Sequence, residues 1–210
     1  SLIGSDAETA EGILGNAVNI SSSTNLFVLP MGPMDKGYER SVACWVKTKE
    51  EGRQLILNSG SYWSKTGQFF NLGLNNGNLE LALRPEIYTT TSGQKINDGE
   101  WHHIAVVVPD RDASIENFKL FVDGRRIEEK QTKKPGANIK TNQANWMAVA
   151  TQPGTYKTDL VSTMDMQDYV GLLDDFSIWT RALTENEIKQ LFTEGLKGKN
   201  ALEVEESFMH

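Results

Sequence analysis

Residues 98–108 read DGEWHHIAVVV, a turn signal followed by a strand whose last five positions are all apolar. Side chains on a strand alternate between two faces, so residues 104–108 leave no face for water. Residues 42–46, VACWV, show the same pattern, and residues 118–122, FKLFV, come close to it. Strands of this kind are covered on both sides, which requires at least two stacked layers.

Short apolar runs separated by turn signals continue on both sides of these segments, as in an all-β chain. Asn76-Gly77 and Asp123-Gly124 each separate two runs, and both pairs favour the positive backbone angles of a tight hairpin. We therefore expect antiparallel strands. Their expected ranges are 16–20, 25–29, 40–48, 53–59, 68–75, 78–84, 86–91, 101–109, 117–123, 125–131, 145–150 and 169–180.

One helix signal lies near the C-terminus. Thr184 and Glu187 have the spacing of a capping box, in which each side chain accepts a backbone N–H at the start of the helix. Ile188 and Leu191 begin an apolar stripe, and Gly195 stands where a C-terminal cap is expected. The sequence thus predicts an all-β chain with one short C-terminal helix.

Length and composition favour one domain. The chain has 210 residues, of which 39% are hydrophobic and 23% charged, so it can bury a sizeable core. We expect a sandwich domain at residues 12–196, a leading segment at 1–11 and a tail or linker at 197–210. A net charge of −7 argues against nucleic acid as a partner, since a phosphate-binding surface needs clustered Lys and Arg. Cys44 is the one cysteine, so no internal disulfide supports the fold.

Five segments, in order along the chain, resemble the strands of bacterial laminin-G-like modules, which are related to pentraxins. They are GILGNAVNI at 12–20, SVACWVK at 41–47, DGEWHHIAV at 98–106, LFVDG at 120–124 and GLLDDFSIWTRAL at 171–183. The resemblance implies a concanavalin A-like jelly roll, an antiparallel sandwich of two sheets that frequently carries structural calcium. The chain departs from the family in three places. Cys44 has no disulfide partner, Ile20-Ser21-Ser22 replaces the usual Phe-Asp-Gly, and the family's opening strand is not recognisable before Gly12.

The resemblance also implies a role and a location. In bacteria such modules are usually exported and join other domains to carbohydrate or protein ligands. The sequence shows no signal peptide and no apolar run of membrane-spanning length, and it starts at Ser1 as an excised piece would. The lack of such an apolar run predicts no membrane insertion. The family resemblance predicts an extracellular, cell-surface or periplasmic location. The leading prediction is a carbohydrate-binding or adhesive module of a larger exported bacterial protein; a protein-interaction module is the alternative, and a glycoside hydrolase or lyase of this fold is the third.

Catalytic signatures are missing from the sequence. Glucanases of this fold class place acids at alternate positions of one strand, so that two carboxylates share a face. Here Glu80 stands alone in its strand, while Glu128 and Glu129 are adjacent and so point to opposite faces. No G-x-S-x-G or phosphate-binding glycine motif is present. We therefore predict that the chain is not an enzyme.

Aromatic residues in polar loops are the candidate ligand-binding residues. A sugar ring presents an apolar face that stacks on exposed aromatic rings, while amides bind its hydroxyls. Trp45, Trp101 and Trp179 lie in apolar strands and are expected in the core instead. The preferred platform combines Trp63 with Trp146 and their polar neighbours. The predicted ligand-binding residues are Tyr62, Trp63, Tyr88, Asn142, Asn145, Trp146 and Tyr156.

Asp174 and Asp175 are the candidate metal ligands. They stand in an apolar strand, where a buried carboxylate is costly unless it is paired, hydrogen-bonded or bound to a metal. Calcium, which takes several oxygen ligands, would neutralise it, and Asn19 is a candidate further ligand. The alternative is that the carboxylates accept backbone N–H bonds. His102 and His103 are adjacent on a strand, so they cannot share one ion.

Two charged clusters are interpreted as solvated surface. The basic cluster contains Lys130, Lys133, Lys134 and Lys140, and an anionic polymer is its alternative partner. The acidic cluster contains Asp159, Asp165 and Asp168, whose spacing does not match an EF-hand loop. We assign no site to either cluster.

Overall fold

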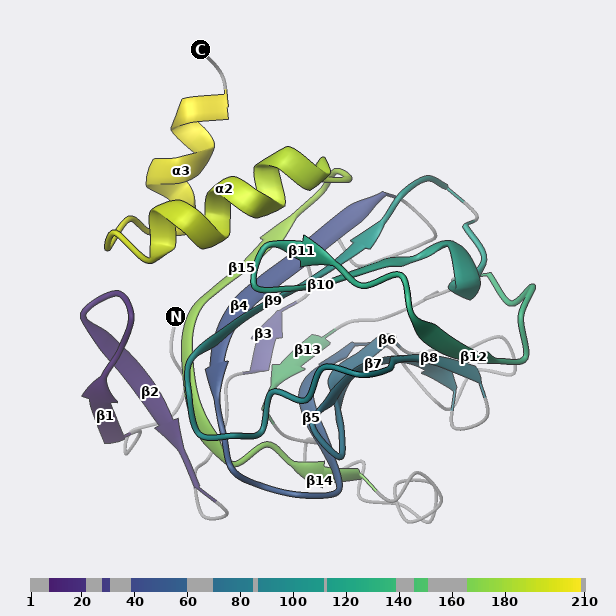
Figure 1. Ribbon diagram of the computed structural model, residues 1–210, viewed down its shortest axis with the longest axis horizontal. Coiled ribbons are helices and arrows are strands. Elements are labelled where there is room, and N and C mark those ends of the chain that lie inside the picture. The colour runs from purple at the N-terminus through teal and green to yellow at the C-terminus, as the bar shows by residue number, and fades with distance from the viewer. Residues whose placement is uncertain are drawn as a thin grey trace.

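Two β-sheets stack face to face in this computed structural model (Figure 1), which describes residues 8–21, 28–30, 39–59, 70–84, 87–111, 113–138, 146–150 and 166–208. Neighbouring strands pair antiparallel, apart from one short parallel pair between β14 (Met166–Asp168) and β5 (Arg53–Ser59). The predicted antiparallel two-sheet sandwich is therefore confirmed.

Strand order in each sheet follows from long-range pairing. Across the described part of the first sheet, the order is β1 (Glu8–Glu11), β2 (Asn16–Ile20), β15 (Gly171–Trp179), β4 (Arg40–Lys47), β9 (His102–Val108), β10 (Lys119–Val122) and β11 (Arg125–Arg126). Across the described part of the second sheet, the strand order is β12 (Lys130–Lys133), β8 (Ile87–Thr91), β7 (Asn78–Arg84), β6 (Phe70–Asn75), β5, β13 (Trp146–Val149) and β3 (Val28–Pro30). A short 3-10 helix, η1 (Ile115–Asn117), precedes β10.

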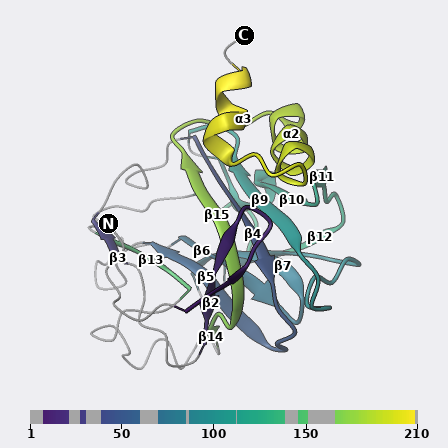
Figure 2. The same ribbon diagram turned by 90° about the vertical axis from the view of Figure 1, so that its left-hand side faces the viewer.

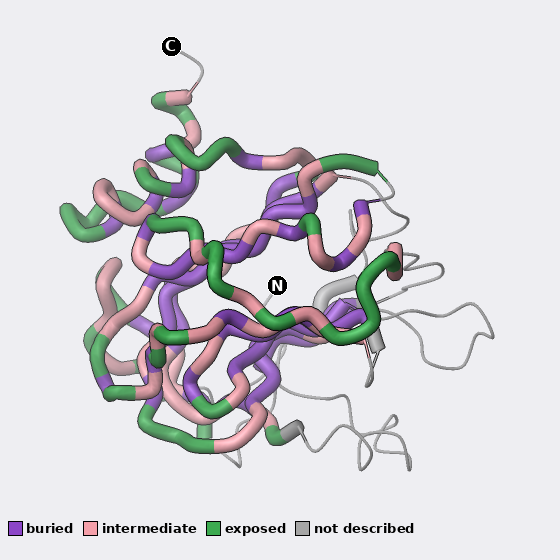
Figure 3. The backbone as a smooth tube through the Cα atoms, turned by 45° about the vertical axis from the view of Figure 1, so that its right-hand side comes forward, coloured by how far each residue is buried: buried purple, intermediate pink, exposed green. Residues whose placement is uncertain are grey.

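The two doubly apolar segments form neighbouring central strands, as predicted. In β4, Val42, Cys44 and Val46 point into the main core between the sheets, whereas Ala43 and Trp45 lie on the opposite face. β4 pairs with β9 along seven residues, and buried residues run through the central strands of both layers (Figure 3). Both faces are buried because a second apolar cluster covers the outer side of this sheet.

Two helices form that second cluster with the outer face of the first sheet (Figure 2). The helix α2 (Glu185–Gly195) begins with the predicted capping box, in which Thr184 Oγ1 accepts the Glu187 N–H and Glu187 accepts the Thr184 N–H. Gly195 is not the C-terminal cap that we expected. It is the last residue of α2, and a Cβ there would lie 3.0 Å from the Trp45 ring, so glycine lets the helix approach this tryptophan.

The flanking segments contribute more structure than the sequence predicted. A second helix, α3 (Ala201–Phe208), places Ala201 and Val204 in the outer cluster. Glu8–Glu11, in the predicted leading segment, is strand β1 and pairs with β2. In the described ranges, neither helix has the length and apolar character needed to span a membrane.

Candidate functional site

The outer face of the second sheet carries a row of polar side chains. Alternation along β7 sends its leucines into the core and leaves Asn78, Glu80 and Ala82 on the outer face. The strand register then places Thr90 of β8 beside Glu80, and Gln131 of β12 beside Thr90. Residues far apart in the sequence therefore share one surface.

Glu80 is the buried centre of this surface, with 1% of its area exposed. Its Oε1 accepts a hydrogen bond of 2.8 Å from Arg53 Nε and a second from Arg53 Nη2. Its Oε2 accepts 2.9 Å and 3.0 Å hydrogen bonds from Asn75 Nδ2 and Thr90 Oγ1. Both oxygens are thus occupied by internal donors, so Glu80 holds neighbouring side chains in place.

Tyr88 lies next to this network on β8. Its half-buried ring packs with Leu55 and Ala82 in a small apolar cluster. The Arg53 guanidinium carbon lies 5.2 Å from the ring centroid, and the Lys133 ammonium nitrogen lies 5.7 Å from it. Cations at these distances are attracted to the π-face of a tyrosine. Tyr88 is therefore fixed in position by both packing and charge.

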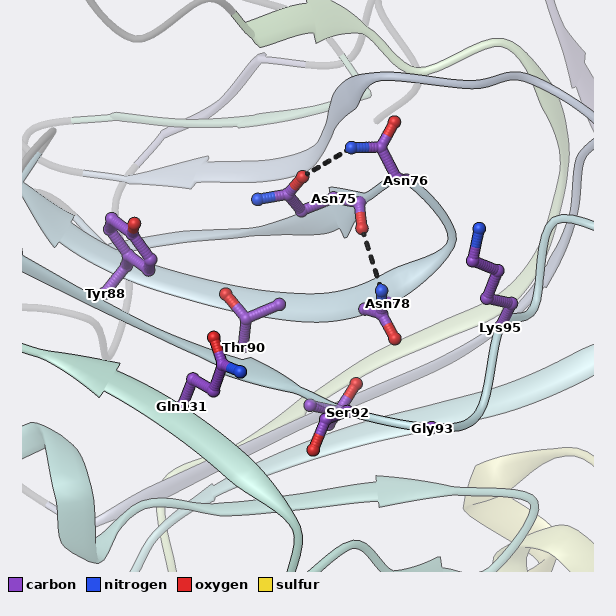
Figure 4. Close-up of a pocket in the computed structure, with 10 residues that line it drawn as sticks. Asn75, Asn76, Asn78, Tyr88, Thr90, Ser92, Gly93, Lys95 and Gln131 are labelled. Carbon is purple, nitrogen blue, oxygen red and sulfur yellow. Dashed lines mark hydrogen bonds between the residues drawn. The ribbon is translucent and has the colours of Figure 1, made fainter.

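A hollow of about 470 Å³ opens beside Tyr88. This volume lies within the range of roughly 300–1,000 Å³ that small-ligand sites span. Figure 4 shows Tyr88 at one end and Lys95 at the other. The lining residues are Asn75, Asn76, Asn78, Tyr88, Thr90, Thr91, Ser92, Gly93, Lys95 and Gln131. Amides and hydroxyls dominate this wall, which suits a ligand rich in hydroxyl groups.

Part of this polar wall has no internal partner. Among the described residues, the Lys95 ammonium, the Ser92 hydroxyl and the Gln131 amide take part in no hydrogen bond or ion pair. Asn78 uses its amide nitrogen to donate to the Asn75 carbonyl, so its side-chain oxygen is also available (Figure 4). Donors and acceptors that the fold does not use are free to bind a ligand.

The structure tests little of the predicted aromatic platform. Tyr88 does line the hollow, and Trp146 belongs to β13 of the same sheet. The remaining predicted residues lie outside the described ranges: Tyr62, Trp63, Asn142, Asn145 and Tyr156. The platform therefore stays a prediction. The sequence analysis did not identify Asn75, Asn78, Ser92, Lys95 or Gln131.

Asp174 and Asp175 have separate backbone partners. Asp174 Oδ2 accepts the Leu14 N–H at 2.9 Å, and its Oδ1 accepts the Asp175 N–H at 2.8 Å. Asp175 sits at a β-bulge with a φ of 45°, and its Oδ2 accepts the Ala201 N–H at the start of α3 at 2.9 Å. Burial, only partly offset by this hydrogen bond, raises the pKa of Asp175 to about 6.

These contacts match the alternative in which the carboxylates accept backbone N–H bonds. Asn19 pairs with Leu172, two residues before Asp174, and so lies on the same face of the sheet as Asp174. No group of three carboxylate, histidine or cysteine side chains in the described ranges is placed to hold a metal. Calcium takes roughly six to eight oxygen ligands, so Asp174, Asp175 and Asn19 would need backbone carbonyls and water to complete a site. Calcium binding stays an untested prediction.

The two histidines occupy different surroundings. His102 lies between two carboxylates, with Nδ1 2.9 Å from Asp123 Oδ2 and Nε2 3.2 Å from Asp98 Oδ1. The hydrogen bond to Asp123 raises the pKa of His102 above its ordinary value. His103 is buried against Trp45 and Phe192, and burial lowers its pKa to about 4. His102 thus links two turns, and His103 is neutral and packs against aromatic rings on the outer side of the first sheet.

Two lysines of the basic cluster, Lys130 and Lys133, have different contacts. Lys130 donates to the backbone carbonyls of Glu116 and Phe118, both at 2.6 Å, so it anchors η1 to β12. Lys133 lies beside Tyr88 at the edge of the hollow. Lys130 therefore has a structural role, whereas Lys133 borders the candidate site.

Comparison with known proteins places this geometry in context. A laminin G family model, described as the concanavalin A-like lectin/glucanases superfamily, matches residues 21–189. No curated protein matches the chain.

Solved structures share the fold at low sequence identity. A heptameric SAP-like pentraxin from Limulus polyphemus is 13% identical over 87% of this chain and 82% of its own, with a TM-score of 0.59. Domain 4 of AbnA, an extracellular GH43 arabinanase from Geobacillus stearothermophilus in complex with arabinotriose, is 20% identical over 91% and 86%, with a TM-score of 0.62. The CBM40 of a Ruminococcus gnavus IT-sialidase, bound to α2,3-sialyllactose, is 13% identical over 84% and 96%, with a TM-score of 0.59. At these identities the likeness concerns the fold alone.

Proposed function

This chain belongs to the concanavalin A-like lectin/glucanase superfamily, and from that premise we propose that it is a non-catalytic carbohydrate-binding module. The observation that carries the proposal is the polar hollow beside Tyr88, whose wall includes side chains with no hydrogen-bond partner among the described residues. Sugar hydroxyls both donate and accept hydrogen bonds. Amide and hydroxyl side chains, which do the same, are suitable partners for them.

The comparisons support the same class of ligand. Two of the structures that share the fold are complexes with oligosaccharides: arabinotriose in one and sialyllactose in the other. The arabinanase is described as extracellular, which agrees with our proposal that this chain acts outside the cytoplasm as part of a larger exported bacterial protein. An adhesive role on a protein partner is the alternative.

The geometry around Glu80 favours binding over hydrolysis. A glycoside hydrolase of the usual kind needs two carboxyl groups that flank the scissile bond, one of them free to donate a proton. Glu80 has both oxygens engaged by Arg53, Asn75 and Thr90. We therefore expect no release of reducing sugar from a polysaccharide panel. Such release would favour the hydrolase alternative.

The double variant Gln131→Ala/Ser92→Ala tests the hollow. A glycan array identifies a bound saccharide, and titration calorimetry then measures its Kd for both proteins. We expect the variant to bind about thirtyfold more weakly, because each of the two lost hydrogen bonds contributes about 1 kcal/mol. Its melting temperature should match that of the unchanged protein, since these side chains make no internal hydrogen bond among the described residues.

Gln190→Ala is the matched control. Gln190 lies on α2, which packs on the first sheet, away from the hollow on the second (Figure 1). Its removal should leave Kd unchanged. Equal Kd values for the double variant and the control would contradict the proposed site, and an array without any bound glycan would contradict the proposed function.

The aromatic platform is tested by Trp63→Ala and Trp146→Ala on the same array. Loss of ring stacking should weaken saccharide binding roughly five- to tenfold, since aromatic contacts dominate many binding interfaces. Melting curves identify a variant that has merely unfolded. If binding survives both substitutions, the platform prediction is wrong, and the hollow alone carries the ligand.

A further inference from the structure

The charge around the hollow differs from that of the whole chain. The net charge of the protein is −7, yet Lys95 lines the hollow and Lys133 lies beside Tyr88 at its opposite end. Lys95 is exposed and forms no ion pair within the described part of the chain. Neither lysine has an ion pair among the residues that the structure describes, and two such cations beside a polar hollow favour a ligand with negative charge.

The carboxylates of Glu80 and Glu129 also lie beside the described part of the hollow. Glu80 is buried and is compensated by the Arg53 guanidinium, so that pair adds no net charge to the hollow. Glu129 lies at the rim: its Oε2 is 3.6 Å from the position that a Cβ on Gly93 would take. Lys95, Lys133 and Glu129 together carry one net positive charge.

We propose that the hollow binds an acidic oligosaccharide whose uronate carboxylate pairs with Lys95, an inference that rests on the proposed carbohydrate-binding function. A lysine ammonium forms a charge-assisted hydrogen bond with a carboxylate, and such bonds are stronger than those between neutral groups. Ser92 and Gln131 then bind the sugar hydroxyls, while Lys133 attracts the charge of the next uronate. Lys133, one member of the basic cluster to which the sequence analysis assigned no site, thereby contributes to the choice of ligand.

The test compares trigalacturonate with its fully methyl-esterified form, which keeps the hydroxyls but loses the charge. By titration calorimetry at low salt, we expect the free acid to bind about fivefold more tightly than the ester, the upper end of what an exposed ion pair contributes. This preference should shrink at 0.5 M NaCl, where charges are strongly screened.

Three variants locate the effect. Lys95→Gln should remove most of the preference for the acid and leave only the part that Lys133 contributes. Glu129→Gln should strengthen binding of the acid by about twofold, since it removes a repulsive charge. Lys189→Gln, at an exposed position on α2, should change neither value. A gain of affinity in Glu129→Gln is a result that loss of folding could not produce.

The outcomes separate this inference from the function on which it rests. Equal binding of acid and ester, or a preference that Lys95→Gln does not reduce, overturns the proposed pairing with Lys95 and leaves carbohydrate binding intact. If the protein binds neutral glycans on the array but neither trigalacturonate nor its methyl ester, the preference for an acidic ligand is likewise overturned and carbohydrate binding stands. An array on which no glycan binds overturns both proposals.

Discussion

Replacing Glu80 with alanine is expected to lower the free energy of unfolding by about 3 kcal/mol or more. The carboxylate is 1% exposed and accepts hydrogen bonds from Arg53, Asn75 and Thr90. Its removal leaves the guanidinium, 17% exposed in this pair, without its buried counter-charge. Breaking a buried ion pair in this way costs far more than losing an exposed one. Urea unfolding followed by tryptophan fluorescence measures the change.

Two further variants show which part of the loss is electrostatic. Glu80→Gln keeps the shape of the side chain and one acceptor oxygen but removes the charge. We therefore expect it to lower the free energy of unfolding by an intermediate amount, about 2 kcal/mol. Glu100→Ala, at an exposed position, should change stability by less than about 0.5 kcal/mol. If Glu80→Ala proves as mild as Glu100→Ala, then water replaces the carboxylate, and the surface next to the hollow is not held by this pair.

The sandwich could be predicted because its signals are local. An apolar side chain at every position marks the central strands β4 and β9, and Asn76-Gly77 marks the hairpin between β6 and β7. Each of these patterns has one physical solution in water: burial on both faces, or a tight turn. Such features do not depend on which strands become neighbours.

The missed elements depend on tertiary contacts. In α3, Ala201 and Val204 are buried only because the sheet and α2 meet them there, so a Glu-rich segment gives no clear stripe. The segment predicted as one strand at 125–131 divides: Arg125–Arg126 pairs in the first sheet and Lys130–Lys133 in the second. No local pattern marks the point where a chain crosses between sheets.

That crossing explains why the hollow could not be foreseen. Gln131 reaches Thr90 only through the register between β12 and β8, and Lys95 joins them from the loop that follows β8. Tyr88 was identified because an aromatic residue among polar neighbours is a signal in itself. A polar site assembled across strands needs the register, and register is a property of the folded sheet.

Asparagine at position 175 is expected to stabilise the protein at pH 8, and this substitution also tests the calcium prediction. Burial raises the pKa of Asp175 from its ordinary value of 3.8 to about 6. The folded state therefore holds this proton more tightly than the unfolded chain does, so stability falls as the pH rises from about 4 to 6. Above about pH 6 the buried carboxylate is ionised, and its full destabilising effect on the folded state is present.

Asp175→Asn removes the charge and little else. The asparagine side-chain oxygen can still accept the Ala201 N–H, and asparagine tolerates the left-handed backbone found here, with φ at 45°. We expect the free energy of unfolding to rise by about 1–2 kcal/mol at pH 8 and not to rise near pH 3.5. The value at pH 8 is set below that of a fully buried carboxylate because the side chain is partly exposed. Urea unfolding at both pH values measures it, with the exposed Asp110→Asn as the control.

Calcium binding predicts the opposite sign for the same substitution. If Asp174 and Asp175 held the ion, the unchanged protein would melt at a lower temperature after chelation, and Asp175→Asn would lose stability at pH 8 because a ligand is missing. If Asp175 instead caps α3, chelation leaves the melting temperature unchanged and Asp175→Asn gains stability. The Ala201 N–H already occupies one oxygen of this carboxylate, so we expect the second result. The direction of a single substitution thus distinguishes a helix-capping carboxylate from a metal ligand.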